Sequence, residues 1–244
     1  KIGHYVKVLM DDIFGIKNFR ADITRIKCNP KNFSRKSYGN IKDMLLFYTK
    51  SGDYIWNDVS ASYTKQDINH LFKKEESNGR KYTTIPLHAP GETKNGTTNS
   101  MWNGILPPKG RHWRSSPKEL DILEKKGLIE WSANNVPRKK IYADELILKG
   151  KKMQDIWEFK DPQTPLYPTE KNSLMLEYII KNSSNESSIV LDCFCGSGST
   201  LAAAQKLGRK WIGIDESAKA IEITIKRLSA LSNSLFNQND FVLI

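Results

Sequence analysis

The spacing of apolar residues changes along the chain, and each change predicts a different element. Apolar side chains between residues 5 and 14 recur at helical intervals, so we expect a short helix that Gly15 ends. The apolar run 43–48 is typical of a buried strand. A further amphipathic helix is expected over 117–126, with Ser116 as its N-cap.

The pattern becomes regular after residue 161. Helix, strand, helix, strand and helix are expected in alternation at 174–180, 188–193, 199–207, 210–214 and 217–231. Both strands are short and apolar, and a glycine turn connects the first of them to the helix that follows. Short apolar strands that alternate with amphipathic helices are typical of a parallel, doubly wound sheet. The sequence therefore predicts an α/β fold.

Residues 59–160 interrupt this pattern. Proline and glycine cluster there, as in the stretch 107–110, and they divide the chain into short elements. We therefore expect three parts. Residues 1–58 and 161–244 would belong to one α/β domain, and residues 59–160 would be an inserted, irregular region.

Composition narrows the class of protein. Of the 244 residues, 39% are apolar and 27% charged, which is typical of a soluble globular chain and not of a disordered tail or a collagen-like repeat. No apolar run approaches the roughly 20 residues of a membrane span, and the first residues do not form a secretion signal. Because the chain does not begin with Met, we expect a fragment of a longer protein.

Cysteines and histidines are few. Three cysteines and four widely spread histidines supply neither a disulfide framework nor the ligands of a structural metal. Cys193 and Cys195 alternate at a strand end and are expected to point to opposite faces, which disfavours a redox pair. We therefore expect no metal and a reducing, cytoplasmic compartment.

Positive charge is concentrated in two stretches. The chain has 38 Lys and Arg against 27 Asp and Glu, a net charge of +11. No acid occurs in 23–42 or in 93–118, and the second stretch also contains Trp102 and Trp113. Such stretches are either solvated loops above packed aromatic rings or surfaces that neutralise phosphates and stack bases. The presence of two such runs with aromatics favours a nucleic-acid surface.

The segment 192–200 carries the most specific chemistry. It leaves a predicted strand at Asp192, turns at Gly196 and Gly198 and opens a helix, which is where open α/β sheets bind ligands. The two glycines permit a tight turn and a close approach of the backbone to a ligand. Asp215 ends the next strand, where an acid accepts hydrogen bonds from ribose hydroxyls.

The segment 192–200 has several possible interpretations. It binds one of several ligand classes, or it is a tight turn that binds no ligand. A dinucleotide fingerprint needs a third glycine where Leu201 stands, and a P-loop needs Gly-Lys-Ser/Thr, which is absent. S-adenosylmethionine has a ribose and a methionine ammonium but no phosphate. It suits an acid before the turn, an apolar wall and an acid after it, and Asp192, Phe194 and Asp215 supply those. The sequence therefore favours S-adenosylmethionine.

The order of motifs along nearly the whole chain resembles β-class amino-methyltransferases that act on DNA. Tyr-Pro-Thr-Glu-Lys at 167–171 and Asp-x-Phe-x-Gly-x-Gly at 192–198 follow one another as in that family. Further segments similar to it are 4–15, 18–20, 35–48, 110–114, 136–142 and 208–215. The resemblance is closest to modification subunits of type III restriction systems.

The resemblance implies a fold and a reaction. The fold would be a Rossmann-like methyltransferase sheet, incomplete in its N-terminal part. Residues 59–160 would recognise the target, and 161–244 would bind S-adenosylmethionine. The reaction would be site-specific methylation of adenine N6 in double-stranded DNA, as the modification component of a restriction–modification system.

The resemblance also implies roles for individual residues. Thr169 and Lys171 would contact the methionine end of the cofactor. The other cofactor positions would be Asp192, Phe194, Gly196, Gly198, Thr200 and Asp215. The DNA-binding positions would be Arg35, Lys36, Tyr38, Arg111, Arg114, Arg138 and Lys139.

One motif of the family does not occur in these residues. The catalytic loop Asp/Asn/Ser-Pro-Pro-Tyr/Phe is expected to hold the target amine of a flipped base. The only Pro-Pro pair, 107–108, lies between Leu106 and Lys109 and does not match. We therefore assign no catalytic residue and expect this chain alone to be inactive.

The absence of that loop leaves alternatives open. The chain is then either part of a methyltransferase or a non-catalytic module that binds DNA or cofactor, including half of a split enzyme. A missing N-terminal segment, a second methyltransferase chain and a restriction subunit are the partners to consider. Cytosine-N4 specificity and an RNA substrate are the less favoured readings.

Overall fold

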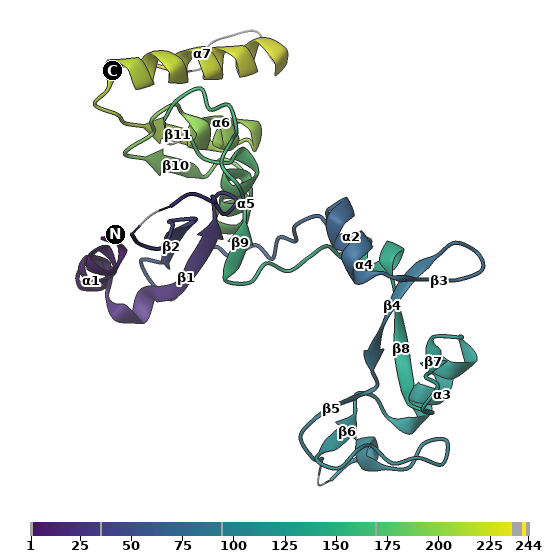
Figure 1. The fold of residues 1–244 in the computed structure, drawn as a ribbon. Helices are drawn as coiled ribbons and strands as arrows, with labels where there is room; N and C mark the ends of the chain where they lie inside the picture. Colours follow the sequence, from purple (N-terminus) through teal and green to yellow (C-terminus); the bar gives the residue numbers. More distant parts are fainter. Residues whose placement is uncertain (1, 35, 94, 169, 236–240, 243–244) are drawn as a thin grey trace. The chain divides into compact units, whose positions relative to one another are not determined.

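The computed structural model describes residues 2–34, 36–93, 95–168, 170–235 and 241–242. The chain divides into two compact units (Figure 1). Unit 1 consists of Lys1–Val59 and Lys152–Ile244, and unit 2 consists of Ser60–Lys151. Residues 152–160, which the sequence pattern assigned to the insertion, lie with unit 1.

Unit 1 holds the α/β part of the chain. Its elements are α1 (Gly3–Phe14), η1 (Ile16–Asn18), β1 (Phe19–Ile26), β2 (Lys42–Tyr48), β9 (Ile156–Glu158), α5 (Ser173–Ser183), β10 (Ile189–Asp192), α6 (Ser199–Lys206), β11 (Lys210–Gly213) and α7 (Ala218–Leu235). The helix predicted to end at Gly15 and the strand predicted over 43–48 are both present, as α1 and β2.

The first sheet of unit 1 has the strand order β2-β1-β9. β1 and β2 are antiparallel, and Arg25 lies opposite Asp43. β9 joins the other edge of β1 in parallel, with Trp157 opposite Arg25. The chain thus leaves this sheet after β2 and returns to it at β9, after the whole of unit 2.

The second sheet of unit 1 contains the parallel strands β10 and β11, connected by α6. Asp192 lies opposite Gly213 at the end of the pair. α6 packs against both strands and against α5 and α7. Its buried Leu201 contacts Leu228 of α7 in the core. The strand–turn–helix–strand–helix order predicted from the sequence, and with it the α/β class, is confirmed.

One face of the β10–β11 pair is uncovered. Ile189 and Leu191 are 66% and 56% exposed, and Ile212 of β11 is 51% exposed. Val190 and Trp211, at the alternate positions, pack into the core that contains α6. Because alternate residues of a strand point to opposite faces, this sheet has one packed and one open apolar face.

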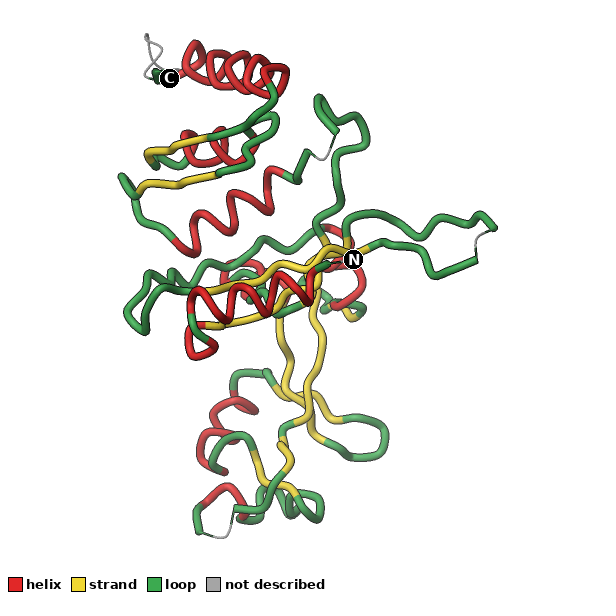
Figure 2. The backbone as a smooth tube through the Cα atoms, turned by 90° about the vertical axis from the view of Figure 1, so that its left-hand side faces the viewer, coloured by secondary structure: helices red, strands yellow, loops and turns green. Residues whose placement is uncertain are grey.

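Unit 2 has its own sheets and its own core. Its elements are α2 (Lys65–Leu71), β3 (Lys74–Glu75), β4 (Lys81–Pro86), β5 (His88–Pro90), η2 (Thr97–Asn99), β6 (Arg111–Trp113), α3 (Pro117–Lys125), β7 (Ile129–Trp131), β8 (Pro137–Tyr142) and α4 (Ala143–Lys149). A four-stranded sheet has the order β3-β4-β8-β7, and β5 pairs with β6. Figure 2 shows β4 and β8 as the long antiparallel pair of this unit.

The helix predicted in the middle region forms as α3, and its start has a local cause. Ser116 Oγ accepts a hydrogen bond from the Glu119 backbone N–H at 3.4 Å, and Glu119 Oε2 accepts one from the Ser116 N–H at 2.7 Å. This reciprocal capping box pairs two amide groups at the helix start.

Among the described residues, no helix has the length and apolarity needed to cross a membrane.

Candidate functional site

The turn between β10 and α6 is closed by the strand beside it. Ile214 donates its backbone N–H to the Asp192 carbonyl at 2.9 Å, and Cys195 donates its own to the Ile214 carbonyl at 3.0 Å. Asp192 Oδ1 accepts a hydrogen bond from the Phe194 N–H at 3.1 Å. The backbone therefore folds back over the carboxyl ends of both strands, which is where ligands bind in open α/β sheets.

Asp215 links the two strand ends. Its Oδ2 accepts a hydrogen bond from the Gly196 N–H at 2.8 Å, and its Oδ1 accepts one from the Ser217 N–H at 3.0 Å. An ionised carboxylate has about four lone-pair sites, so each oxygen retains one for a ligand. Asp215 thus both shapes the turn and presents acceptors at the position expected of a ribose-binding acid.

Two glycines of this site cannot be replaced without strain. Gly198 has φ +71°, and a Cβ on it would lie 2.7 Å from Thr224 Cγ2. A Cβ on Gly213 would lie 2.3 Å from Leu201 Cδ1. The turn is held further by Thr224, whose Oγ1 donates to the Gly196 carbonyl at 2.9 Å. The backbone of 196–198 is therefore fixed between β11 and α7.

The structure brings most of the predicted cofactor residues together. Asp192, Phe194, Gly196, Gly198 and Asp215 lie on one turn and the adjacent strand end, and Phe194 is 90% exposed above it. Thr200 is half-buried in the first turn of α6. Thr169 lies outside the described residues.

The segment that contains Lys171 runs from the glycine turn to the first sheet. The Tyr167 ring lies 3.7 Å from the position that a Cβ on Gly196 would take. Glu170 Oε1 accepts a hydrogen bond from Arg227 of α7 at 2.6 Å. Lys171 Nζ lies 4.0 Å from Asp43 Oδ2 on β2. Three successive contacts thus fix this segment between the two sheets of unit 1.

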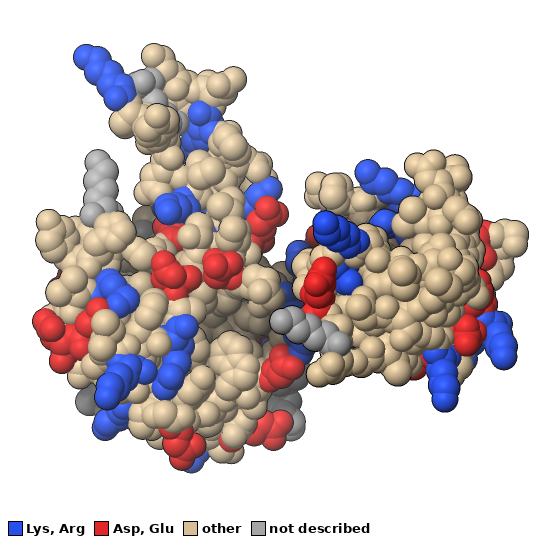
Figure 3. Space-filling model, turned by 90° about the horizontal axis from the view of Figure 1, so that it is seen from below, with Lys and Arg blue, Asp and Glu red and all other residues tan. Residues whose placement is uncertain are grey.

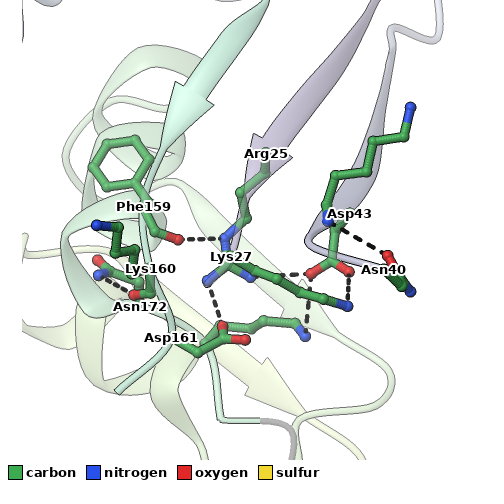
Figure 4. Close-up of polar contacts among 10 residues, drawn as sticks. Arg25, Lys27, Asn40, Asp43, Phe159, Lys160, Asp161 and Asn172 are labelled. Carbon is green, nitrogen blue, oxygen red and sulfur yellow. Dashed lines mark hydrogen bonds and ion pairs between the residues drawn. The ribbon is translucent and has the colours of Figure 1, made fainter. Parts of the chain in front are cut away.

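A buried arginine that the sequence analysis did not identify lies beneath Lys171. Arg25 is fully buried, and Figure 4 shows its guanidinium between Asp43, Asp161 and the Phe159 carbonyl. Its Nη1 lies 3.1 Å from Asp43 Oδ2, and its Nε donates to the Phe159 carbonyl at 2.7 Å. Nη2 pairs with Asp161. The sequence signal for this site was a charged residue at an inward position of an apolar strand. Its partners could not be identified from local sequence, because they lie far along the chain.

The loop between β1 and β2 borders a cleft of about 950 Å³. Lys27, Lys31, Asn40 and Lys160 are among the residues that line it. Tyr38 is fully exposed on this loop, and Lys36 is exposed nearby. Neither residue lines the cleft. Arg35 lies outside the described residues.

Three of the predicted DNA-binding arginines lie around one histidine of unit 2. The Arg111 guanidinium is 3.2 Å from His88 Nδ1, and Arg114 donates its backbone N–H to the Leu87 carbonyl at 2.7 Å. Burial lowers the pKa of His88, and the charges of Arg111, Arg114 and Arg138 lower it further. The arrangement therefore gathers positive charge beside a neutral imidazole.

The predicted DNA-binding residues of unit 2 differ in their exposure and in their hydrogen bonds. Arg138 donates to Thr84 Oγ1 and to the Thr84 carbonyl, both at 2.8 Å, so its guanidinium is engaged within the sheet. Arg114 is exposed, whereas Arg111 and Lys139 are half-buried. Figure 3 shows Lys and Arg mixed with acidic side chains on the face it presents, without one continuous basic surface.

The interpretation of the tryptophans as a base-stacking surface is wrong. Trp102 and Trp113 are 3% and 1% exposed, and they form the core of unit 2 with Leu87 and Leu120. Trp102 stacks on Trp131 with ring centroids 5.6 Å apart. The aromatics of this basic stretch therefore pack beneath the loop because they supply the core that a small unit needs.

Metal ligation finds no support in the described residues, where no three His, Cys, Asp or Glu side chains are grouped to hold an ion. Cys28, Cys193 and Cys195 are all free thiols. Burial raises the pKa of Cys195, and the nearby Asp192 and Asp215 raise it further, so this thiol is the opposite of an activated nucleophile.

Comparison with known proteins places the chain in a family. The model of the family described as DNA methylase matches residues 2–226. Type II methyltransferase M.EcaI of Enterobacter cloacae is 42% identical over 238 residues, which are 93% of this chain and 52% of that protein. Type II methyltransferase M2.LlaDCHI of Lactococcus lactis subsp. cremoris is 36% identical over 110 residues, 41% of each chain. The chain thus spans about half the length of these relatives or less.

Among solved structures, the chain is similar to that of the M1.HpyAVI-SAM complex. The sequence identity is 19% and the TM-score 0.44, over 93% of this chain and 69% of that one. The relatives reported above are named type II enzymes, so the closer resemblance to type III modification subunits stays a prediction. The extent of the family match leaves no doubt about the coarser assignment: the chain belongs to the DNA methylase family.

Proposed function

We propose that this chain is the cofactor-binding and target-recognising part of an S-adenosylmethionine-dependent DNA methyltransferase. The target atom is adenine N6, and the biological role is modification in a restriction–modification system. Unit 1 binds the cofactor, and unit 2 contacts double-stranded DNA. The methyl acceptor is held by groups from outside these 244 residues.

The observation that carries this proposal is the pair of hydrogen bonds to Asp215. They fix the carboxylate beside the glycine turn and leave acceptor sites on both of its oxygens. A ribose with two adjacent hydroxyls matches two such sites. Gly196 and Gly198 place no side chain between the turn and a ligand, and the 90% exposed Phe194 offers an apolar surface for an adenine ring. No Lys follows the turn, which argues against a triphosphate.

The methionine end of the cofactor is assigned to Lys171. Its side chain is 47% exposed and belongs to a segment that begins beside the glycine turn with Tyr167. A carboxylate is the group that a lysine at this place would bind.

A split enzyme is the second candidate, and one observation favours it. The open apolar face of β10 and β11 belongs to a sheet of only two strands, whereas parallel sheets are normally covered on both faces. A polypeptide with strands and helices of its own would cover that face. If it also carried an Asp-Pro-Pro-Tyr-type loop, the two chains together would form the complete active site.

Calorimetry with S-adenosylhomocysteine tests the cofactor assignment, because this demethylated product of S-adenosylmethionine is stable and has the same ribose and amino-acid ends. We expect one site per chain and no competition from ATP or NAD. Binding of ATP or NAD in preference to S-adenosylhomocysteine would contradict the assignment. Methyl transfer by the complete enzyme to three duplexes tests the target atom. The duplexes carry unmethylated adenine, N6-methyladenine or N4-methylcytosine, and premethylation of adenine alone should block transfer.

A further inference from the structure

Asp43 lies where the two halves of unit 1 meet. It is the first acidic residue after the basic stretch that precedes it, and it lies on β2 directly opposite Arg25. Its Oδ1 is 2.8 Å from Lys27 Nζ, and its Oδ2 is 3.1 Å from Arg25 and 4.0 Å from Lys171. One carboxylate thus lies beside Arg25 of β1, Lys27 directly after β1 and Lys171 of the segment that follows Tyr167.

The carboxylate is itself held in place. Arg25 is fixed by the Phe159 carbonyl and by Asp161, and Asp161 donates its backbone N–H to the Lys27 carbonyl at 2.8 Å. Because Arg25 has no exposed surface, it cannot follow a moving partner. Asp43 is therefore a fixed point, whereas the side chain of Lys171 is 47% exposed and lies 4.0 Å from it.

We propose that Asp43 is a positioning residue that holds the Lys171 ammonium toward the methionine carboxylate of the cofactor. The inference rests on the proposed function, because it requires Lys171 to meet that carboxylate. Asp43 itself does not touch the cofactor. It acts through Lys171, in the way that a buried carboxylate orients a ligand-binding side chain.

Charge in the cluster agrees with an anionic ligand. Arg25, Lys27 and Lys171 bring three positive charges, and Asp43 and Asp161 bring two negative ones, so one positive charge remains. Burial raises the pKa of Asp43, but the Lys27 hydrogen bond and the charges of Lys27, Lys171 and Arg25 outweigh it. The pKa of Asp43 therefore lies below its ordinary value, and the residue is ionised at neutral pH.

The same cluster connects the cofactor segment with the predicted target side. Lys160 accepts a hydrogen bond through its carbonyl from Asn172, which also caps α5. Lys27 and Lys160 are among the residues that line the cleft beside the β1–β2 loop.

Two ligands separate a positioning role from a structural one. S-adenosylhomocysteine carries the amino-acid end, whereas 5′-methylthioadenosine has the same adenosine and sulfur without it. In Asp43→Asn we expect binding of S-adenosylhomocysteine to weaken by about 3- to 30-fold. This change lies within the range of interaction energies between contacting residues. Binding of 5′-methylthioadenosine should stay unchanged. Asp22→Asn, an exposed acid of β1, is the matched control and should change neither.

The coupling between Asp43 and Lys171 provides the decisive comparison. Lys171→Met should weaken only S-adenosylhomocysteine, and adding Asp43→Asn to it should cost little more, because the ammonium to be positioned is gone. Fully additive losses, or equal losses for both ligands in Asp43→Asn, would overturn the inference. Asp43→Glu keeps the charge but displaces it. This variant should show a smaller loss confined to S-adenosylhomocysteine, and it serves as the test if the Asn variant does not fold.

Failure of the proposed function has a different signature. If the wild type binds no S-adenosylhomocysteine, the cofactor assignment is wrong. If Lys171→Met binds it as tightly as the wild type, the assignment of Lys171 to the methionine end is wrong. The inference about Asp43 fails with it. If Lys171→Met loses affinity and folded Asp43→Asn does not, only the positioning role is wrong.

Discussion

The Arg227 guanidinium donates a 2.6 Å hydrogen bond to Glu170 Oε1 and a 2.7 Å hydrogen bond to Ser199 Oγ. The arginine comes from α7, the glutamate from the segment before Lys171, and the serine from the first turn of α6. The Arg227 side chain therefore connects the segment before Lys171 with α6, the helix that follows the glycine turn. The side chains of Arg227 and Glu170 are only 17% and 11% exposed, so water competes little with the pair.

Arg227→Met should destabilise unit 1 by about 1.5–3 kcal/mol, the scale of a hydrogen bond to a charged group that leaves its partner unpaired. Urea unfolding followed by circular dichroism measures this. Lys226→Met is the matched control on the same helix, because its side chain is 74% exposed and pairs with the exposed Glu222. A midpoint for Arg227→Met equal to that of the control would show that the buried pair does not stabilise the segment.

Asp215→Ala should weaken binding of S-adenosylmethionine by about 1.5–3 kcal/mol, or roughly 10- to 150-fold. The structure adds a second effect, because the same substitution leaves the Gly196 and Ser217 amides without their acceptor. The unfolding midpoint must therefore be measured beside the affinity. Glu216→Ala removes an exposed neighbouring acid and should change neither. Unchanged affinity in folded Asp215→Ala would remove Asp215 from the site.

DNA binding should weaken steeply with salt. If four to six phosphates are neutralised, the slope of log K against log salt is about −4 to −5. Arg114→Ala should reduce its magnitude by about 1 without loss of stability, since this side chain is exposed. Arg138→Ala should also destabilise unit 2, because its guanidinium bonds to Thr84. A slope near zero would mean that the positive charge does not contact DNA.

Stability of unit 2 should fall at high pH. The hydrogen bond that Tyr82 donates to Glu130 at 2.7 Å, together with burial, raises the pKa of Tyr82 from 10.0 to about 12. A pKa raised in the folded state contributes stability that is complete below pH 10 and is lost as the pH rises toward 12. Phenolate absorbance should show a late-ionising component near pH 12 that decreases in Tyr82→Phe. Ionisation of every tyrosine near pH 10 would refute this.

Local signals predicted the elements that depend on local chemistry. Gly15 ends α1, the Ser116–Glu119 box begins α3, and the glycine turn lies between β10 and α6, because each involves residues within a few positions of one another. Pairing across the chain was not predictable in this way. β1 was not expected as a strand, and Arg25 finds Asp161 from 136 positions away.

The site shows the same division. The acids and glycines of the turn follow from motif spacing, whereas the contacts of Lys171 with Asp43 and of Glu170 with Arg227 depend on how sheets and helices pack. The tryptophans of the basic stretch had two readings that composition could not separate. Burial decided between them, because unit 2 needs Trp102 and Trp113 for its core.

The central claim is that these residues provide the methyl donor's site but not the groups that hold the target amine. Positioned acceptors contribute about 3–4 kcal/mol each, and orientation contributes several more. Without them we expect the rate to fall by at least about five decades. Labelled methyl transfer from S-adenosylmethionine to duplex DNA, by residues 1–244 with and without a polypeptide carrying an Asp-Pro-Pro-Tyr-type loop, measures this directly. We predict no transfer by the chain alone and activity in the mixture. Robust transfer by the chain alone would place the catalytic acceptors within it and contradict the account.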